Sequence, residues 1–183
     1  MFRRACAAFF ACLLLGVAPL AAIPALRLKQ TADFARLESY FEYPIPLVSS
    51  IAGIRRDGFG KGHFGASRDG GRTHEGIDLL VEVRMPIRAS KSGRVVFAGL
   101  GKGYGKYVEI AHPDGRSTRY AHLSEVCHQK GDWVHRGDVI GVSGKTGNAA
   151  NRHIRPHLHF EIRYAGKAIN PVSGPLNPTV RLK

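Results

Sequence analysis

Residues 157–163 read HLHFEIR, with polar and apolar side chains in strict alternation. Successive side chains of a β-strand point to opposite faces, so this segment predicts a strand with one core face. Its residues divide into a core face of Leu158, Phe160 and Ile162 and a polar face of His157, His159, Glu161 and Arg163. On the polar face, two imidazoles are expected side by side, about 7 Å apart by strand geometry.

Short apolar runs separated by turn residues continue this pattern along the chain. They predict strands at residues 77–81, 94–98, 106–111, 117–123, 138–143 and 158–164. The sequence Pro113-Asp114-Gly115 favours a hairpin turn between two of them. The 22 glycines and 10 prolines of the 183-residue chain also favour short strands over a helical bundle. We therefore predict an all-β fold, with a compact antiparallel β-sheet domain over residues 51–172.

The N-terminal residues resemble an export signal. Arg3 and Arg4 precede an uncharged run from Ala5 to Leu26, as in a signal peptide. Residues 1–26 are predicted to be a signal peptide or, alternatively, an uncleaved N-terminal membrane anchor. In both cases the rest of the chain is exported to the periplasm or cell envelope, with residues 5–26 as the inner-membrane anchor in the second case.

Three further segments flank the predicted strands. Residues 27–50 are expected to form a short helix and a linker, with the helix from Thr31 to Tyr43 and its end at Pro44. The Gly- and Arg-rich segment 51–75 lacks periodicity and predicts a long loop. Residues 173–183 are expected to be a basic C-terminal tail.

Two other segments place polar residues on strand faces. Around residues 74–78, alternation puts His74, Gly76 and Asp78 on one face, and Gly76 leaves room above the sheet. Around residues 119–123, the same rule puts Tyr120 and His122 on a shared face.

These polar faces carry the ligand types that zinc prefers. Two histidines and one aspartate make a three-ligand zinc set with an open position for water. Imidazole and carboxylate suit this cation, and the sequence has no cysteine cluster that would favour a structural site. We predict an open groove in the β-domain that carries one Zn²⁺ ion.

The ordered motifs resemble those of the lysostaphin-like (LytM-type) zinc metallopeptidases. The resemblance is carried by three segments over roughly residues 58–172: His74-x-x-x-Asp78, Tyr120-Ala121-His122-Leu123 and His157-x-His159. It extends to connecting pieces such as Gly76-Ile77-Asp78, His112-Pro113-Asp114-Gly115 and Gly141-Val142-Ser143-Gly144.

The resemblance implies a peptidoglycan endopeptidase and assigns roles to five residues. It implies that His74, Asp78 and His159 bind zinc, and that His122 and His157 are catalytic histidines flanking the bound water. Histidine titrates near neutrality and fits both proton acceptance and oxyanion stabilisation. Which of His122 and His157 is the base stays open.

Several other residues have a functional and a structural interpretation. Glu161 could orient the imidazole of His159, or be an ordinary strand charge. Tyr120 could contact substrate or cap the sheet, and Arg68 and Arg72 could meet anionic groups of a substrate. Glu75 has the wrong parity for the metal set and is expected at the surface.

The remaining histidines and the cysteine are expected to have structural or surface roles. His112 is expected to support the turn at Pro113, and Cys127 to fill space as a small apolar side chain. The other histidines, expected at the surface, are His63, His128, His135 and His153.

One segment departs from the family pattern. Residues 148–155 are longer than the commonest family linker at this place and add Arg152, His153 and Arg155 to one rim of the groove. Their role stays open.

The charge balance indicates partners. With 27 Lys and Arg against 14 Asp and Glu, the formal net charge is +13, which favours anionic wall polymer or a membrane surface as partner. No nucleic-acid-binding pattern is present, so nucleic acid is not expected. A monomer that acts on peptidoglycan peptides is expected.

Two other functions compete with peptidoglycan hydrolysis. A protein of this fold could be a catalytically silent regulator of wall amidases, or a zinc protease acting on Gly-rich proteins. The sequence leaves open which peptide bond is cut and whether residues 27–60 occlude the groove.

Overall fold

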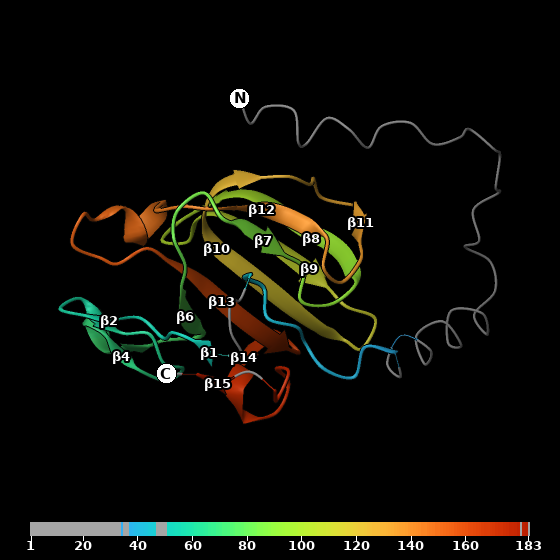
Figure 1. Ribbon diagram of the computed structural model, residues 1–183, viewed down its shortest axis with the longest axis horizontal. Helices are drawn as coiled ribbons and strands as arrows, with labels where there is room; N and C mark the ends of the chain where they lie inside the picture. The colour runs from blue at the N-terminus through green and yellow to red at the C-terminus, as the bar shows by residue number, and fades with distance from the viewer. Residues whose placement is uncertain (1–33, 35–36, 47–50, 180, 183) are drawn as a thin grey trace.

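The computed structural model describes residues 34, 37–46, 51–179 and 181–182. Within these residues the centre of the molecule is one nine-stranded sheet (Figure 1). Its strands are β6 (Ile77–Leu80), β7 (Pro86–Arg88), β8 (Gly93–Gly101), β9 (Gly105–Ala111), β10 (Arg116–Val126), β11 (Trp133–Val134), β12 (Val139–Ser143), β13 (His157–Tyr164) and β14 (Lys167–Ile169). All neighbouring strands are antiparallel. The predicted all-β, antiparallel fold is confirmed.

The sheet order places three strands beside β13. Strands follow the order β11-β8-β9-β10-β12-β7, and β13 pairs with β10, β14 and β6. In this register His159 lies opposite Asp78 of β6 and opposite Ala121 of β10. The strand β13 therefore brings together segments that are about 80 residues apart in sequence.

All six predicted strands are present, and their alternation sets the core. Leu158, Phe160 and Ile162 of β13 are at most 1% exposed, as are Ile77 and Leu79 of β6. Three strands of this sheet were not predicted, β7, β11 and β14. They are only two or three residues long, too short to show a periodic pattern.

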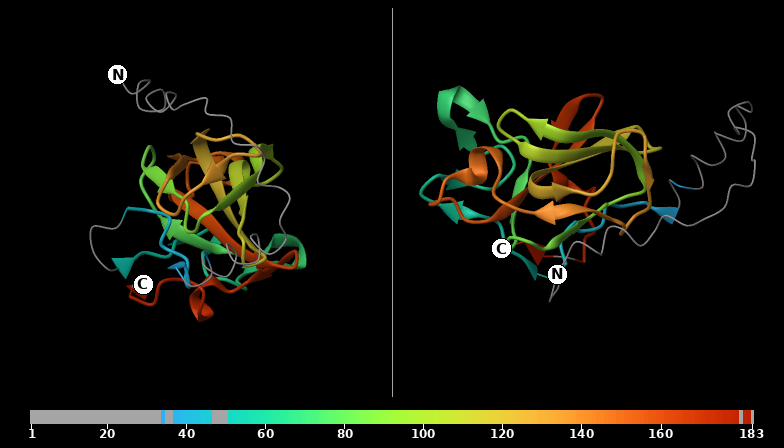
Figure 2. Two further views of the ribbon diagram at one scale, coloured as in Figure 1. Left: turned by 90° about the vertical axis from the view of Figure 1, so that its right-hand side faces the viewer. Right: turned by 90° about the horizontal axis from the view of Figure 1, so that it is seen from above.

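The segment 51–75 is not the continuous loop that its composition predicts. It forms short extended pieces: β1 (Ile51–Ala52), β2 (Arg56–Asp57), β3 (Gly60–Lys61), β4 (Ser67–Arg68), the 3₁₀-helix η1 (Asp69–Gly71) and β5 (Arg72–Thr73). β2 pairs with β3 and β4 with β5 as separate hairpins. Figure 2 shows these hairpins at the same end of the molecule as the segment that follows η2 (Gly147–Ala150).

The predicted helix from Thr31 to Tyr43 is wrong in its second half. Phe34 and Leu37 are helical, but the chain leaves the helix at Glu38. Phe41 is instead fully buried and forms a β-bridge with Leu176. Burial of this ring, worth about 2–3 kcal/mol, outweighs the weak preference of a short isolated segment for helix.

The C-terminal part packs beside this N-terminal segment. After η3 (Pro171–Ser173), Leu176 is 5% exposed, and β15 (Arg181–Leu182) pairs in parallel with β1. The predicted signal or anchor, residues 1–26, lies outside the described residues. In the part of the chain that the structure describes, no helix has the length and apolar character needed to cross a membrane.

Candidate metal centre

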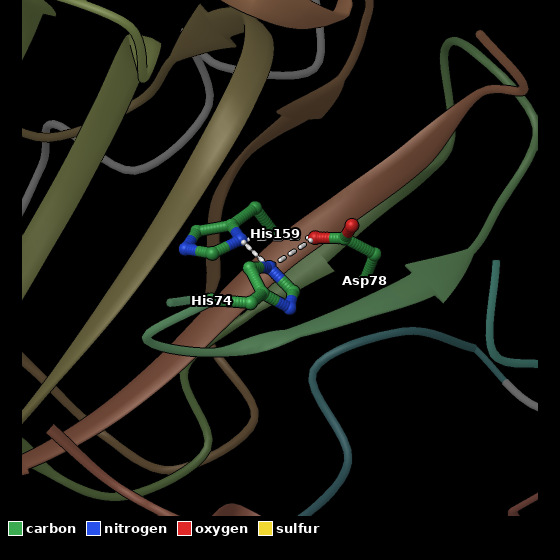
Figure 3. Close-up of side chains that lie close together, drawn as sticks. All are labelled: His74, Asp78 and His159. Carbon is green, nitrogen blue, oxygen red and sulfur yellow. Dashed lines mark hydrogen bonds and ion pairs between the residues drawn. The ribbon is translucent and has the colours of Figure 1, made fainter. Parts of the chain in front are cut away.

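Three side chains predicted as metal ligands converge at one point (Figure 3). His74 immediately precedes β6, Asp78 lies within β6, and His159 lies opposite it on β13. The distances His74 Nε2 to His159 Nδ1, His159 Nδ1 to Asp78 Oδ1 and His74 Nε2 to Asp78 Oδ1 are each 2.9 Å. All three residues are buried.

The hydrogen bonds around the two imidazoles fix which nitrogen faces the centre. Nδ1 of His74 lies 2.8 Å from the carbonyl of His63, and Nε2 of His159 lies 3.0 Å from Oε1 of Glu161. A carbonyl and a carboxylate accept only, so these nitrogens carry the protons. Each ring therefore directs its other nitrogen, with a free lone pair when neutral, toward Asp78.

This donor set fits a zinc ion. Ligands of tetrahedral zinc lie about 3.4 Å from one another, since each is about 2.0–2.1 Å from the metal. The three ligand atoms are 2.9 Å apart, so each separation must increase by about half an ångström to meet this value. The two imidazole nitrogens and the carboxylate oxygen all face one another with lone pairs. Without a metal, added protons are needed to form hydrogen bonds between these three atoms.

Gly76 allows the two strands to approach at this point. A Cβ there would lie 2.5 Å from the carbonyl oxygen of Phe160 and 2.9 Å from Cε1 of His159. Any side chain larger than hydrogen would therefore displace the His159 ring or separate β6 from β13.

His122 also reaches the centre, but not by the alternation that the sequence predicts. Tyr120 is fully buried on the core face, whereas the His122 ring lies beside His157 and His159 on the polar face. The prediction that Tyr120 and His122 share a face is wrong. A register shift between Tyr120 and Leu123 and a positive φ of 65° at His122 reverse the alternation.

His122 and His157 flank the three-residue cluster, and each contacts a backbone carbonyl through Nδ1. Their ring centroids are 4.9 Å apart, and Nε2 of His157 is 3.9 Å from Oδ1 of Asp78. Nδ1 of His122 donates to the carbonyl of Thr146 at 2.9 Å, and Nδ1 of His157 donates to that of Arg155 at 2.7 Å. Both rings therefore keep Nε2 free to accept a proton.

Burial sets the protonation of these two rings. Desolvation, with the neighbouring imidazoles His157 and His159, lowers the pKa of His122 to about 3. Desolvation also lowers the pKa of His157. Both imidazoles are therefore neutral at pH 7 in the metal-free protein.

His159 and its two carboxylate partners have opposite shifts. Desolvation lowers the pKa of His159, but hydrogen bonds with Asp78 and Glu161 outweigh it and raise the value to about 9. The pKa of Asp78 is held well below its usual value, because hydrogen bonds from His159 and His74 outweigh desolvation. By the same balance, contact with His159 lowers the pKa of Glu161 to about 2.

Glu161 contacts His159 and three other side chains next to the candidate metal ligands. Besides His159, its carboxylate accepts from the Tyr104 hydroxyl at 2.7 Å and contacts Arg119 at 3.3 Å and Arg163. Of the two interpretations of Glu161, the structure favours the contact with His159, and Glu161 is fully buried, unlike an ordinary strand charge. No role was predicted for Tyr104 or Arg119 from the sequence, although Arg119 begins the segment 119–123 that carries His122.

The outer oxygen of Asp78 has its own partners. Nε and NH2 of Arg55 each lie 3.1 Å from Oδ2, and NH2 of Arg68 lies 3.3 Å from it. Arg55 is only 4% exposed. No sequence signal singled it out, because it lies in the non-periodic segment before β6.

The cluster opens into a groove with a volume of about 760 Å³. Charged residues from separate segments line it, including Arg68, Arg72, Glu75 and Lys102, and Phe59 and Tyr104 add aromatic rings. Tyr120 does not line it. Of the two interpretations of Tyr120, the structure favours the structural one, since its buried hydroxyl accepts from the Ser90 backbone N–H and the Thr118 hydroxyl. The ring is needed to fill the core.

The other predicted residues lie where expected. His112 is buried beside the 113–115 turn and contacts the Ser92 carbonyl and Thr118 hydroxyl. Glu75 is half exposed and pairs with Arg163. Cys127 is partly buried and does not belong to the groove lining.

The chain is similar to known cell-wall proteins. It is 44% identical over 111 residues to the DD-carboxypeptidase/endopeptidase Mpg of Neisseria meningitidis, covering 61% of this chain and 24% of Mpg. It is 39% identical over 110 residues to the murein hydrolase activator NlpD of Escherichia coli, covering 60% of this chain and 27% of NlpD. The chain thus spans about a quarter of the length of the curated relatives it matches.

Solved structures share the fold. A zinc-containing peptidase from Vibrio cholerae aligns with a TM-score of 0.59 and 27% identity, over 77% of this chain and 42% of that chain. The catalytic domain of lysostaphin from Staphylococcus simulans aligns with a TM-score of 0.52 and 33% identity, over 63% and 88%. The resemblance drawn from the motifs is confirmed. Since residues 72–171, more than half of the chain, match Peptidase family M23, this protein belongs to peptidase family M23.

Proposed function

We propose that this protein is a zinc metalloendopeptidase that hydrolyses peptide cross-links of bacterial cell-wall peptidoglycan outside the cytoplasm. The observation that carries the proposal is the convergence of His74, Asp78 and His159, with His122 and His157 beside them. Its similarity to Mpg, described as a DD-carboxypeptidase/endopeptidase, supports peptide-bond hydrolysis in the wall.

In this proposal His74, Asp78 and His159 hold the zinc ion through Nε2, Oδ1 and Nδ1. When bound there, zinc supplies a Lewis acid that polarises the scissile carbonyl and acidifies water. The hydrogen bonds from Nδ1 of His74 and Nε2 of His159 keep these rings in the tautomer that binds a cation.

His122 and His157 move the protons. Because both rings are neutral at pH 7, one of them accepts the proton of the attacking water on Nε2. As an imidazolium it then donates to the departing amine nitrogen, while the other ring orients the reacting group. The carbonyls of Thr146 and Arg155 stabilise the charged ring, since each accepts from Nδ1.

The groove favours an acidic substrate. Arg72 and Lys102 add positive charge to its lining, and the chain has a net charge of +13. Carboxylates of the wall peptides are the groups these cations would meet, and long-range attraction to an anionic wall would raise the encounter rate. We propose a monomer that acts in the periplasm or cell envelope.

The test measures zinc content and the release of new amino termini from purified cross-linked muropeptides. His159→Ala should lose zinc and activity together. His122→Ala should retain zinc and lose roughly 10²–10⁴-fold in kcat. His135→Ala is the matched control, because this exposed histidine lies outside the groove. Wild-type activity in both His159→Ala and His122→Ala would refute the proposal.

A second candidate function follows from the similarity to NlpD, described as a murein hydrolase activator. A regulator would release no amino termini alone but would stimulate an added wall amidase. In that case His122→Ala would stimulate the amidase as well as the wild type does.

A further inference from the structure

Arg55 is a lining residue of the groove and contacts two carboxylates, those of Asp78 and Asp57. Its Nε and NH2 contact Oδ2 of Asp78, and its NH1 lies 2.7 Å from Oδ1 of Asp57. The side chains of Arg55 and Asp57 are 5% and 9% exposed. Burying such a pair carries a desolvation cost, so its value lies in the geometry that it imposes.

Asp57 extends this contact to the segment that follows η2. Its Oδ2 accepts from the backbone N–H of Arg155 at 3.2 Å. The carbonyl of the same residue accepts from Nδ1 of His157 at 2.7 Å. The residue that sets the His157 tautomer is therefore itself held by Asp57.

Together these contacts form a continuous path. It runs from Asp78 through the Arg55 guanidinium and the Asp57 carboxylate to the Arg155 backbone and then to His157. The ends of the path meet again in the groove, where Nε2 of His157 is 3.9 Å from Oδ1 of Asp78. The contacts therefore link Asp78 and His157, two residues of the candidate metal centre, through Arg55 and Asp57.

We propose that Arg55 and Asp57 are positioning residues that hold Asp78 and His157 in one fixed geometry. Arg55 occupies Oδ2 of Asp78, so the carboxylate offers Oδ1 alone to the metal. Asp57 holds the Arg155 carbonyl, so the His157 ring keeps Nε2 directed at the same centre. This inference rests on the proposed function for the roles of Asp78 and His157.

The chemistry of the two residues explains why other types would not serve. The planar guanidinium presents donors on two edges and reaches both carboxylates at once. A lysine ammonium carries the same charge but has no fixed fork. Arg152, His153 and Arg155 are exposed, so the segment 151–155 depends on contacts such as the one to Asp57 for its position.

The test uses the full 183-residue chain with Arg55→Lys, Asp57→Ala and Asp57→Asn. Zinc affinity is measured by chelator competition, the tautomer of His157 by ¹⁵N NMR, and kcat and KM on a cross-linked muropeptide. Asp114→Asn is the matched control. Like Asp57, Asp114 is an ion-paired aspartate with low exposure that accepts a backbone N–H, but its partners are Lys91 and Arg116 and not the residues around the metal centre.

We expect Arg55→Lys to weaken zinc binding roughly 10–100-fold, the usual effect of losing a partner of a metal ligand. Asp57→Ala should lower kcat by roughly 10–100-fold at saturating zinc, with KM changed less than about threefold. Its His157 should show mixed tautomers. Asp57→Asn should lie between Asp57→Ala and wild type, because its amide oxygen still accepts from Arg155.

Two outcomes would overturn the inference. One is an Asp57→Ala protein with wild-type kcat and an unchanged His157 tautomer. The other is an equal loss in Asp114→Asn, which would indicate general destabilisation. If the wild type cleaves nothing, the proposed function fails, while zinc affinity and the NMR spectrum still decide whether Arg55 and Asp57 position the two side chains.

Discussion

Zinc affinity should depend steeply on pH because a proton competes with the metal for Nδ1 of His159. In the metal-free protein, desolvation of this ring is outweighed by hydrogen bonds with Asp78 and Glu161, so its pKa is about 9. Metal binding must therefore displace a proton at neutral pH.

The magnitude follows from this value. Proton competition multiplies the apparent Kd by about 11 at pH 8 and about 100 at pH 7, a loss of roughly ninefold per pH unit. An imidazole with the ordinary pKa of about 6.5 would change the Kd by less than about 1.5-fold over the same interval.

The assay is a competition titration against a chelator of known pH-dependent affinity between pH 7 and 8.5. Glu161→Gln is the diagnostic variant, since it keeps an acceptor for Nε2 but removes one of the two carboxylate charges that raise the His159 pKa, the other being that of Asp78. Its pH dependence should be flatter. A wild-type affinity that stays constant across this range would refute the reasoning.

The same proton links pH to the stability of the metal-free fold. The folded pKa of His159 lies above its unfolded value of about 6.5, so this contribution is complete below pH 6.5 and disappears as pH rises through about 9. The thermal midpoint of the metal-free protein should fall over that interval.

Three further predictions concern the scaffold. Phe41→Ala should cost about 3–5 kcal/mol in the free energy of unfolding by urea, whereas Leu37→Ala, at a position that is 76% exposed, should cost less than about 0.5 kcal/mol. Gly76→Ala should abolish stoichiometric zinc binding, because the added Cβ crowds the His159 ring. Gly58→Ala is the control, since a Cβ there would have no atom within 4 Å, and zinc retained at wild-type level in Gly76→Ala would contradict the clash. Tyr120→Phe should lower stability by about 1–3 kcal/mol through its lost buried hydrogen bonds while kcat stays unchanged, and a reduced kcat at wild-type stability would restore a substrate role.

Strand alternation is a local property, and it was sufficient to place most of the sheet. The residues of β13 divide as the sequence pattern predicts: Leu158, Phe160 and Ile162 belong to the hydrophobic core, while His159 and Glu161 lie at the metal centre. The polar face is buried as well, because the groove and the neighbouring segments cover it. The same rule placed His74 and Asp78 on one side of the segment 74–78, which leads into β6. It failed at His122, where a bulge with positive φ reverses the alternation, because bulges arise from pairing with a neighbouring strand.

The sequence by itself determined an all-β fold, the polar and core faces of its strands, and the residue types able to hold a metal. The tertiary structure alone decided that β6 and β13 pair with His159 opposite Asp78. It also decided that the His122 ring lies beside His159, and that Arg55 and Glu161 form hydrogen bonds with Asp78 and His159. The reason is physical: side-chain direction follows from the backbone of a few consecutive residues, whereas a distance between residues 55, 78 and 161 depends on how the whole sheet packs.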